Sequence, residues 1–196
     1  MGWVGLSGAH VDGSEPAGLP IRGAHWQARG MAQPLATTQR QLVLLRHAKS
    51  AWPDGVSDAQ RPLTDRGRRD AGAVGRWLRD HVDGLAAVSC SPAVRTRQTW
   101  ELVSAELADP PAAAFDERIY AALPAELLAV VHDLPDGAPT ALLIGHNPGT
   151  EELVELLSGA RQGMSTAALA VLTWQGAWAD AAAQVAQLRE HAAPRG

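Results

Sequence analysis

Four side chains able to take part in catalysis lie just beyond apolar stretches of the sequence. The stretches consist mainly of Leu, Ile, Val and Ala, and the four residues are Arg46, His47, Arg95 and His146. An imidazole can act as a nucleophile or exchange a proton near neutral pH, and a guanidinium offers paired planar donors to phosphate oxygens. This combination suits transfer of a dianionic phosphoryl group, because that reaction depends chiefly on neutralising charge on the phosphoryl oxygens.

The apolar stretches predict the strands that position these residues. Uninterrupted apolar runs are typical of strands buried on both faces, and such runs occur at 42–45, 85–89 and 141–144. Helical spacing follows at 65–81, 93–108, 124–132 and 150–157, and further strands are expected at 115–120, 167–174 and 185–189. Alternating strands and helices predict an α/β fold with three α/β/α layers and a mainly parallel sheet, whose carboxyl ends share one ligand-binding edge. Both histidines and both arginines should meet there.

Arg95 has a second reason to bind an anion. It follows the turn at Ser91 and Pro92 and falls in the first turn of the helix expected over 93–108. Unpaired N–H groups and the positive end of the helix dipole favour anions at that position. Arg97, two residues further on, points in a different direction, so at most one of the two is expected to face the ligand.

Composition excludes several classes of protein. A net charge of −4 and a pI near 5.9 give no reason to expect nucleic acid as a partner, and no apolar run is long enough to span a membrane. The single cysteine, Cys90, rules out an internal disulfide and fits a reducing, cytoplasmic location. Two histidines without a cluster of carboxylates make a poor metal site beside arginines, so neither a metal nor another cofactor is predicted.

The length of 196 residues fits one domain with an extension. Residues 1–39 are rich in Gly, Ala and Pro and show neither a helical nor an alternating pattern, which predicts a disordered N-terminal extension. Residues 40–196 are then the catalytic domain. The sequence does not determine the oligomeric state, and a monomer is the working expectation.

Three motifs resemble those of the histidine phosphatase superfamily: RHA at 46–48, SPAVRTRQT at 91–99 and GHNPG at 145–149. The longer RHAKSAW at 46–52 and RPLTDRG at 61–67 look most like its small branch, the SixA-like phosphohistidine phosphatases. The similarity extends over about residues 41–174. It implies a phosphoglycerate mutase-like fold, with Ala48 at a position that is usually Gly in the wider superfamily and for which Ala is familiar in this branch.

The resemblance implies a role for each candidate residue. His47 would be the nucleophile that forms a phosphohistidine intermediate, while Arg46, Arg95 and His146 would bind the phosphoryl group. Nearby cations would lower the pKa of His47, and a protonated His146 would help to hold the phosphoryl oxygens during the transfer. Two further residues are implied less directly: Arg61 as another phosphate ligand, and Glu117 near the carboxylate that protonates the leaving group in larger relatives.

The short segment between Thr99 and Leu142 leaves room for only a minimal lid. An open pocket favours a metal-independent phosphatase that acts on phosphohistidine of a protein or on a related phosphoprotein. Two alternatives stay open at this point. One is a phosphatase for small phosphoesters, and the other is a phosphate-binding regulatory protein without turnover.

Overall fold

The computed structural model describes residues 1–2 and 38–196. The predicted disordered extension, residues 1–39, falls largely outside the described residues and stays a prediction. Its last residue, Gln39, already belongs to the first strand, one position before the expected start of the domain. The chain divides into the units Met1–Leu35 and Ala36–Gly196, and the fold described below is that of the second unit.

The centre of this unit is a six-stranded sheet with the strand order β3-β2-β4-β1-β5-β6. The strands are β1 (Gln39–Arg46), β2 (Leu85–Cys90), β3 (Ala113–Phe115), β4 (Thr140–Gly145), β5 (Leu169–Gln175) and β6 (Gln187–Ala192). The pairs β1/β4, β2/β4 and β2/β3 are parallel, whereas β5 is antiparallel to both β1 and β6. The mainly parallel sheet of the sequence prediction is confirmed.

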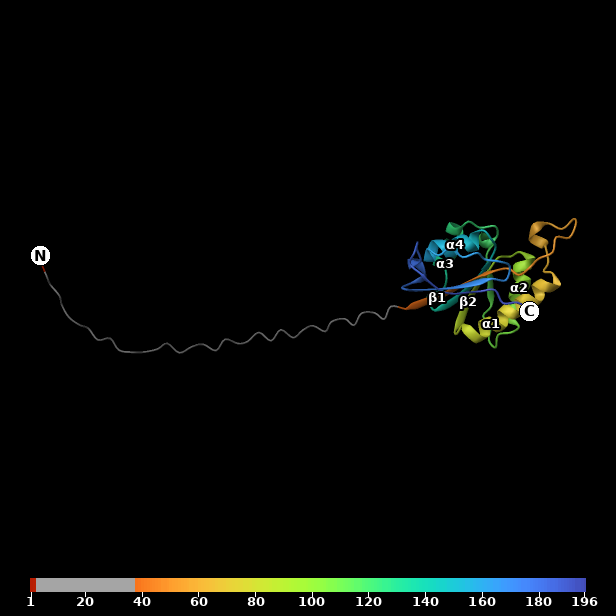
Figure 1. Ribbon diagram of the computed structural model, residues 1–196, viewed down its shortest axis with the longest axis horizontal. Helices are drawn as coiled ribbons and strands as arrows, with labels where there is room; N and C mark the ends of the chain where they lie inside the picture. Colours follow the sequence, from red (N-terminus) through yellow and green to blue (C-terminus); the bar gives the residue numbers. More distant parts are fainter. Residues whose placement is uncertain (3–37) are drawn as a thin grey trace. The chain divides into compact units, whose positions relative to one another are not determined.

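Four helices cover the two faces of the sheet. They are α1 (Asp65–His81), α2 (Val94–Ser104), α3 (Pro124–His132) and α4 (Gly149–Ser158). Helices α1 and α2 lie on one side, and α3 and α4 on the other (Figure 1). The chain between α2 and β4 contains β3, a 3-10 turn and α3, in keeping with the expected minimal lid.

The central strands alternate between two hydrophobic cores. In β1, Leu42 and Leu44 pack into the core shared with α3 and α4, while Val43 and Leu45 pack into the core shared with α1 and α2. Strand β4 does the same, which explains why both strands are uninterrupted apolar runs. The two strands are in register with Arg46 opposite Gly145, so the next residue of each strand leaves the sheet beside its partner.

Two glycines in α1 allow close approach of the backbone. A Cβ atom at Gly67 would clash with the carbonyl oxygen of Lys49, in the loop that follows β1. At Gly75 it would lie 2.6 Å from the carbonyl oxygen of Val103 in α2. These glycines weaken the helix intrinsically, but Gly67 brings α1 against the loop that follows the candidate nucleophile, and Gly75 brings it against α2.

Three predicted strands have different limits in the structure. The strand expected at 115–120 ends as β3 at Phe115, and Glu117–Ile119 form a 3-10 turn because the Asp116 side chain accepts the N–H of Arg118. The strand expected at 167–174 starts at Leu169, after Ala167 with its positive φ of 60°. The last strand is shifted from 185–189 to Gln187–Ala192, after a positive φ at Gln184.

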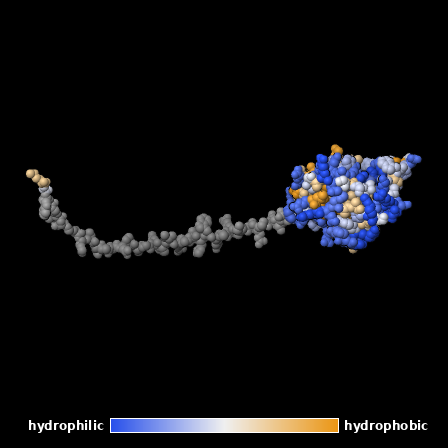
Figure 2. All heavy atoms as spheres, viewed as in Figure 1, coloured by the Kyte–Doolittle hydropathy of each residue, from blue (hydrophilic) through white to orange (hydrophobic). Residues whose placement is uncertain are grey.

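The surface visible in Figure 2 is mostly hydrophilic over the described residues, with hydrophobic side chains in small groups. Within the part of the chain that the structure describes, the helices are all too short or too polar to cross a membrane.

Candidate active site

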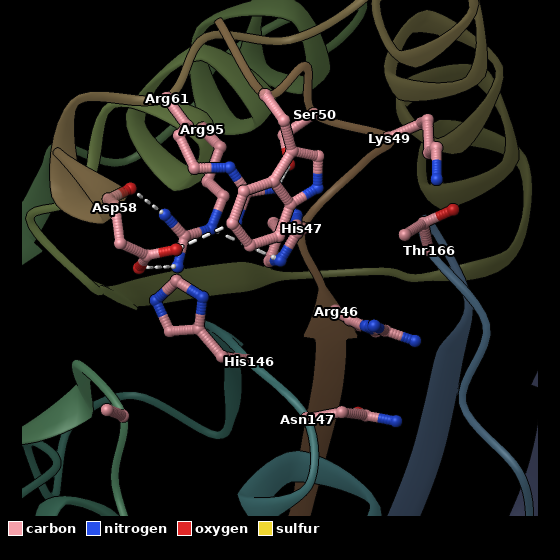
Figure 3. Close-up of a pocket in the computed structure, with 12 residues that line it drawn as sticks. Arg46, His47, Lys49, Ser50, Asp58, Arg61, Arg95, His146, Asn147 and Thr166 are labelled. Carbon is pink, nitrogen blue, oxygen red and sulfur yellow. Dashed lines mark hydrogen bonds and ion pairs between the residues drawn. The ribbon is translucent and has the colours of Figure 1, made fainter. Parts of the chain in front are cut away.

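A cavity of about 340 Å³ opens at the carboxyl ends of β1 and β4 and at the start of α2 (Figure 3). All four residues singled out from the sequence line it, together with Arg61. The full set is Arg46, His47, Lys49, Ser50, Trp52, Asp58, Arg61, Arg95, Ala121, His146, Asn147 and Thr166. Four side chains of this set carry a positive charge and one carries a negative charge, so the cavity suits an anion.

His47 is held at the end of β1 by its backbone and by one ring nitrogen. Its N–H donates to the carbonyl of Gly145 at 3.1 Å, and its carbonyl accepts the N–H of Ala167 at 3.1 Å. The ring Nδ1 lies 2.8 Å from the carbonyl oxygen of Ala48. Because a carbonyl can only accept, Nδ1 carries the proton of the neutral ring, and Nε2 keeps its lone pair.

The pKa of His47 is lowered to about 4. Burial of the ring is the largest cause, and the charges of Arg95, Arg46 and Arg61 add to it, while the bond to Ala48 opposes it. The sequence predicted the direction of this change but attributed it to the cations alone. His47 is therefore neutral at neutral pH, as a nucleophile must be.

Arg95 places its guanidinium directly beside this nitrogen. Its Nε donates to His47 Nε2 at 3.3 Å, and its two terminal nitrogens donate to Asp58, at 2.6 Å to the backbone oxygen and 3.0 Å to Oδ2. Arg95 is buried in the first turn of α2, as the sequence indicated. Arg97 does not line the cavity and instead lies over the ring of Phe115.

His146 follows β4 and packs beside His47, with 5.1 Å between the ring centroids. Its Nε2 lies 2.8 Å from the hydroxyl oxygen of Ser91, and its buried Nδ1 has no partner among the described residues. Its pKa is lowered to about 3, by burial first and then by His47 and Arg95. Burial thus keeps the ring of His146 neutral in the free site, and its protonation beside a phosphoryl group stays a prediction.

Arg46 lines the same cavity and has one buried polar atom without a partner among the described residues. A terminal nitrogen donates to the carbonyl of Met164 at 2.8 Å, whereas its buried Nε has no partner within the described residues. Buried polar atoms are normally hydrogen-bonded. Arg46 and His146 both line the cavity, so each has a buried, unpartnered nitrogen near the place where an anion would bind.

Arg61 is held in the loop after β1 by three acceptors. It donates to the carbonyl of Ala51 at 2.9 Å, to the Ser50 hydroxyl at 2.6 Å and to Asp58 Oδ1 at 2.8 Å. The indole of Trp52 stacks on it, with the ring centroid 3.1 Å from Cζ, although Trp52 is 74% exposed. Arg61 thus lines the cavity, with one N–H of each of its three nitrogens already bonded to the protein, and its role as a phosphate ligand stays a prediction.

Asp58 was not identified from the sequence, yet it contacts both arginines of this wall. Besides Arg61 and Arg95, it accepts a bond from the Tyr120 hydroxyl at 2.7 Å. The bond from Tyr120, followed by that from Arg61, holds the pKa of this carboxyl well below its usual range. The only sequence signal was an Asp three residues before an Arg, in a loop without a motif.

Glu117 is not brought to the cavity. It lies in the exposed 3-10 turn after β3 and is not among the residues that line the pocket. Its neighbour Asp116 is paired with Arg118 at 2.7 Å. Over residues 1–2 and 38–196, His, Cys, Asp and Glu form no group of three that could hold a metal ion.

Comparisons with known proteins agree with this geometry. A family model described as "Histidine phosphatase superfamily (branch 1)" matches residues 42–120. An uncharacterized protein of Mycobacterium tuberculosis strain H37Rv is 40% identical over 147 residues, which cover 69% of this chain and 90% of that protein. That relative matches over most of its own length.

Two solved structures share the fold. A putative phosphohistidine phosphatase SixA from Nakamurella multipartitia has a TM-score of 0.71 and 35% identity, over 80% of this chain and 96% of that one. The protein histidine phosphatase SixA complexed with tungstate has a TM-score of 0.69 and 25% identity, over 79% and 97%. The fold is thus the expected phosphoglycerate mutase-like one, and the chain belongs to the histidine phosphatase superfamily.

Proposed function

We propose that this phosphatase acts without a metal and removes the phosphoryl group from phosphohistidine on a protein, through a covalent intermediate on His47. One observation carries the proposal. The Nε2 lone pair of His47, with Nδ1 bonded to the Ala48 carbonyl, faces Arg95 inside a cavity lined also by Arg46 and His146. A nucleophile with a fixed tautomer and a site for a dianion therefore coincide.

In the first step, Nε2 attacks phosphorus in line as the bond to the leaving group breaks. The Nε–H of Arg95, which donates to His47 Nε2 in the free site, then donates to a phosphoryl oxygen instead. Arg46 and His146, which line the same cavity, hold the other oxygens. A dianion in the cavity raises the pKa of His146 and so favours its protonated, donating form. Each such contact is typically worth a few kcal/mol of barrier.

The state of the nearby acids favours phosphohistidine as the substrate. Asp58 is ionised because its pKa lies well below the usual range, and the other carboxylates of the described residues do not line the cavity. An alkoxide leaving group needs an acid to protonate it. The imidazole of phosphohistidine, once its second nitrogen carries a proton, departs as a neutral ring and does not need one.

The same reasoning applies to the second step. Water attacks phosphorus, and the bond between phosphorus and Nε2 breaks to release inorganic phosphate. His47 then departs as a neutral imidazole, because the Ala48 carbonyl keeps the proton on Nδ1 throughout. The proton of the attacking water goes to the departing phosphate or to solvent.

The mouth of the cavity is consistent with a substrate on a protein surface. Lys49 and Trp52 line it and are both exposed, and the chain between α2 and β4 forms no large lid. The similar SixA structure, named a protein histidine phosphatase, contains tungstate. We also expect a cytoplasmic location, where the buried thiol of Cys90 would stay reduced.

Labelling of the enzyme tests the covalent step. Brief exposure to a radiolabelled phosphodonor in EDTA, followed by rapid quenching, should give a base-stable, acid-labile label that peptide mapping assigns to His47. A label on a serine or on another histidine, or activity that EDTA abolishes, would contradict the proposal.

A substrate panel tests the specificity. We expect kcat/KM for a phosphohistidine protein to exceed that for a phosphoserine peptide and for sugar phosphates by at least about 100-fold, a difference of about 3 kcal/mol in barrier. Equal or higher values for a sugar phosphate would favour a phosphatase for small phosphoesters. Phosphate binding without turnover of any substrate would favour a regulatory binding protein.

A further inference from the structure

Asp58 accepts hydrogen bonds from three residues around the active site, although it lies outside the sequence motifs, in a short 3-10 turn (Asp58–Gln60) after β1. Its Oδ1 accepts from Arg61, its Oδ2 from Arg95 and Tyr120, and its backbone oxygen from Arg95 again. Its own side chain is 46% exposed, whereas that of Arg95 is 6% exposed. Asp58 thus covers the outer ends of buried guanidinium groups from the solvent side.

The bonds divide the guanidinium of Arg95 into two edges. Both terminal nitrogens are bonded to Asp58, at 2.6 and 3.0 Å, while Nε points to Nε2 of His47 at 3.3 Å. A guanidinium is planar and rigid, so fixing its outer edge also fixes the direction of its Nε–H. Asp58 therefore sets the direction of the Arg95 Nε–H, which donates to His47 in the free site and to the phosphoryl group during transfer.

We infer that Asp58 is a positioning residue. It orients Arg95 for phosphoryl transfer by accepting hydrogen bonds from the edge of the guanidinium that faces away from His47. Arg61 and Tyr120 hold Asp58 in turn, so three segments of the chain are joined at one carboxylate. The tyrosine ring also packs edge-on against His146, with 5.6 Å between the centroids. The inference rests on the proposed function, since it assigns Arg95 to the phosphoryl group.

Two simpler roles make different predictions. As a bare negative charge, Asp58 would only repel the phosphoryl dianion, and its neutralisation would tighten binding without slowing turnover. As a structural partner of buried arginines, Asp58 would contribute to the stability of the protein, and its replacement would not change kcat in a variant that still folds. A positioning role predicts a loss of kcat in a protein that remains folded.

The test is Asp58→Asn, which keeps the size of the side chain but has one oxygen acceptor where the carboxylate has two. Asp109→Asn is the matched control, because Asp109 is exposed and outside the cavity and loses the same charge. With p-nitrophenyl phosphate we expect kcat to fall about 10- to 100-fold in Asp58→Asn relative to the control. KM and inhibition by inorganic phosphate should stay the same or indicate tighter binding. Tyr120→Phe, which removes one donor to Asp58, should show a smaller loss in the same direction.

A second measurement does not depend on turnover. The Nε–H resonance of Arg95, assigned by its absence in Arg95→Lys, should be protected from exchange in the wild type and in Asp109→Asn. In Asp58→Asn it should shift and lose protection. Either an unchanged kcat or an unchanged Arg95 resonance in folded Asp58→Asn overturns the inference. Absence of hydrolysis by the wild type would contradict the proposed function, and the resonance alone would then decide the role of Asp58.

Discussion

His47 and His146 occupy equivalent places at the ends of adjacent parallel strands, yet their hydrogen bonds are opposite. His47 has Nδ1 bonded to a backbone carbonyl and turns Nε2 toward Arg95. His146 has Nε2 bonded to Ser91, and its Nδ1 has no partner among the described residues. Both residues are 7% exposed, so burial does not distinguish them. The hydrogen-bond partner of each ring nitrogen distinguishes the two residues.

This difference separates two kinds of catalytic histidine. A carbonyl partner accepts only, so it fixes the tautomer of His47 and leaves a lone pair in the cavity in the neutral state. A hydroxyl partner can donate or accept, so it permits His146 to be neutral in the free site and protonated beside a dianion. Register between β1 and β4 brings the rings together, and the local acceptors assign their roles.

His47→Ala tests the nucleophile and should have the largest effect. Loss of the attacking nitrogen removes the covalent route, so kcat/KM for p-nitrophenyl phosphate should fall by at least about 10⁴-fold. The variant should also take up no label from a phosphodonor. A labelled His47→Ala enzyme would reverse the assignment of the two histidines.

His146→Ala should have a smaller effect, because the residue holds an oxygen and does not form the bond. Removing one such donor typically lowers kcat by about 10²- to 10³-fold. The label should still form on His47, more slowly, as followed by quenched-flow measurement. If His146→Ala were as inactive as His47→Ala and could not be labelled, the distinction drawn from their partners would be wrong.

Dependence of stability on pH tests the feature that the two histidines share. Both have a pKa below the value of 6.5 for an exposed imidazole, about 4 for His47 and about 3 for His146. Below pH 6.5 the unfolded chain binds protons that the folded chain does not, so the free energy of unfolding should fall as pH decreases. His47 alone would account for about 3 kcal/mol between pH 6.5 and 4.

Urea denaturation at several pH values from 7 to 4.5 measures this loss. The lowered pKa of Asp58 acts mainly below this range, since an unfolded Asp titrates near 3.9. His47→Gln and His146→Gln should each show a shallower decrease than the wild type. An equal slope in the wild type and in both variants would mean that neither histidine is kept neutral by burial.

Much of this site was predictable because its residues follow buried strands. Apolar runs mark such strands, and the parallel arrangement brings their carboxyl ends to one edge, which is enough to place Arg46, His47 and His146 together. Asp58 could not be found in this way. Its role depends on side chains from distant segments that meet at the short 3-10 turn containing Asp58, and no local pattern encodes that meeting. The low pKa of His146 in the free site could not be predicted either, because the degree of burial is a tertiary property.

Glu117→Gln should have the smallest effect, less than about twofold on kcat, because Glu117 lies outside the cavity on an exposed turn. Comparison of two leaving groups makes the test stringent. Loss of a general acid slows departure of a serine alkoxide far more than departure of p-nitrophenolate or imidazole, which depart readily without protonation. Glu117→Gln should therefore leave the ratio of rates for a phosphoserine peptide and p-nitrophenyl phosphate unchanged. A selective loss on the phosphoserine peptide would show that Glu117 reaches the leaving group, and the argument that this site favours phosphohistidine for want of an acid would fail with it.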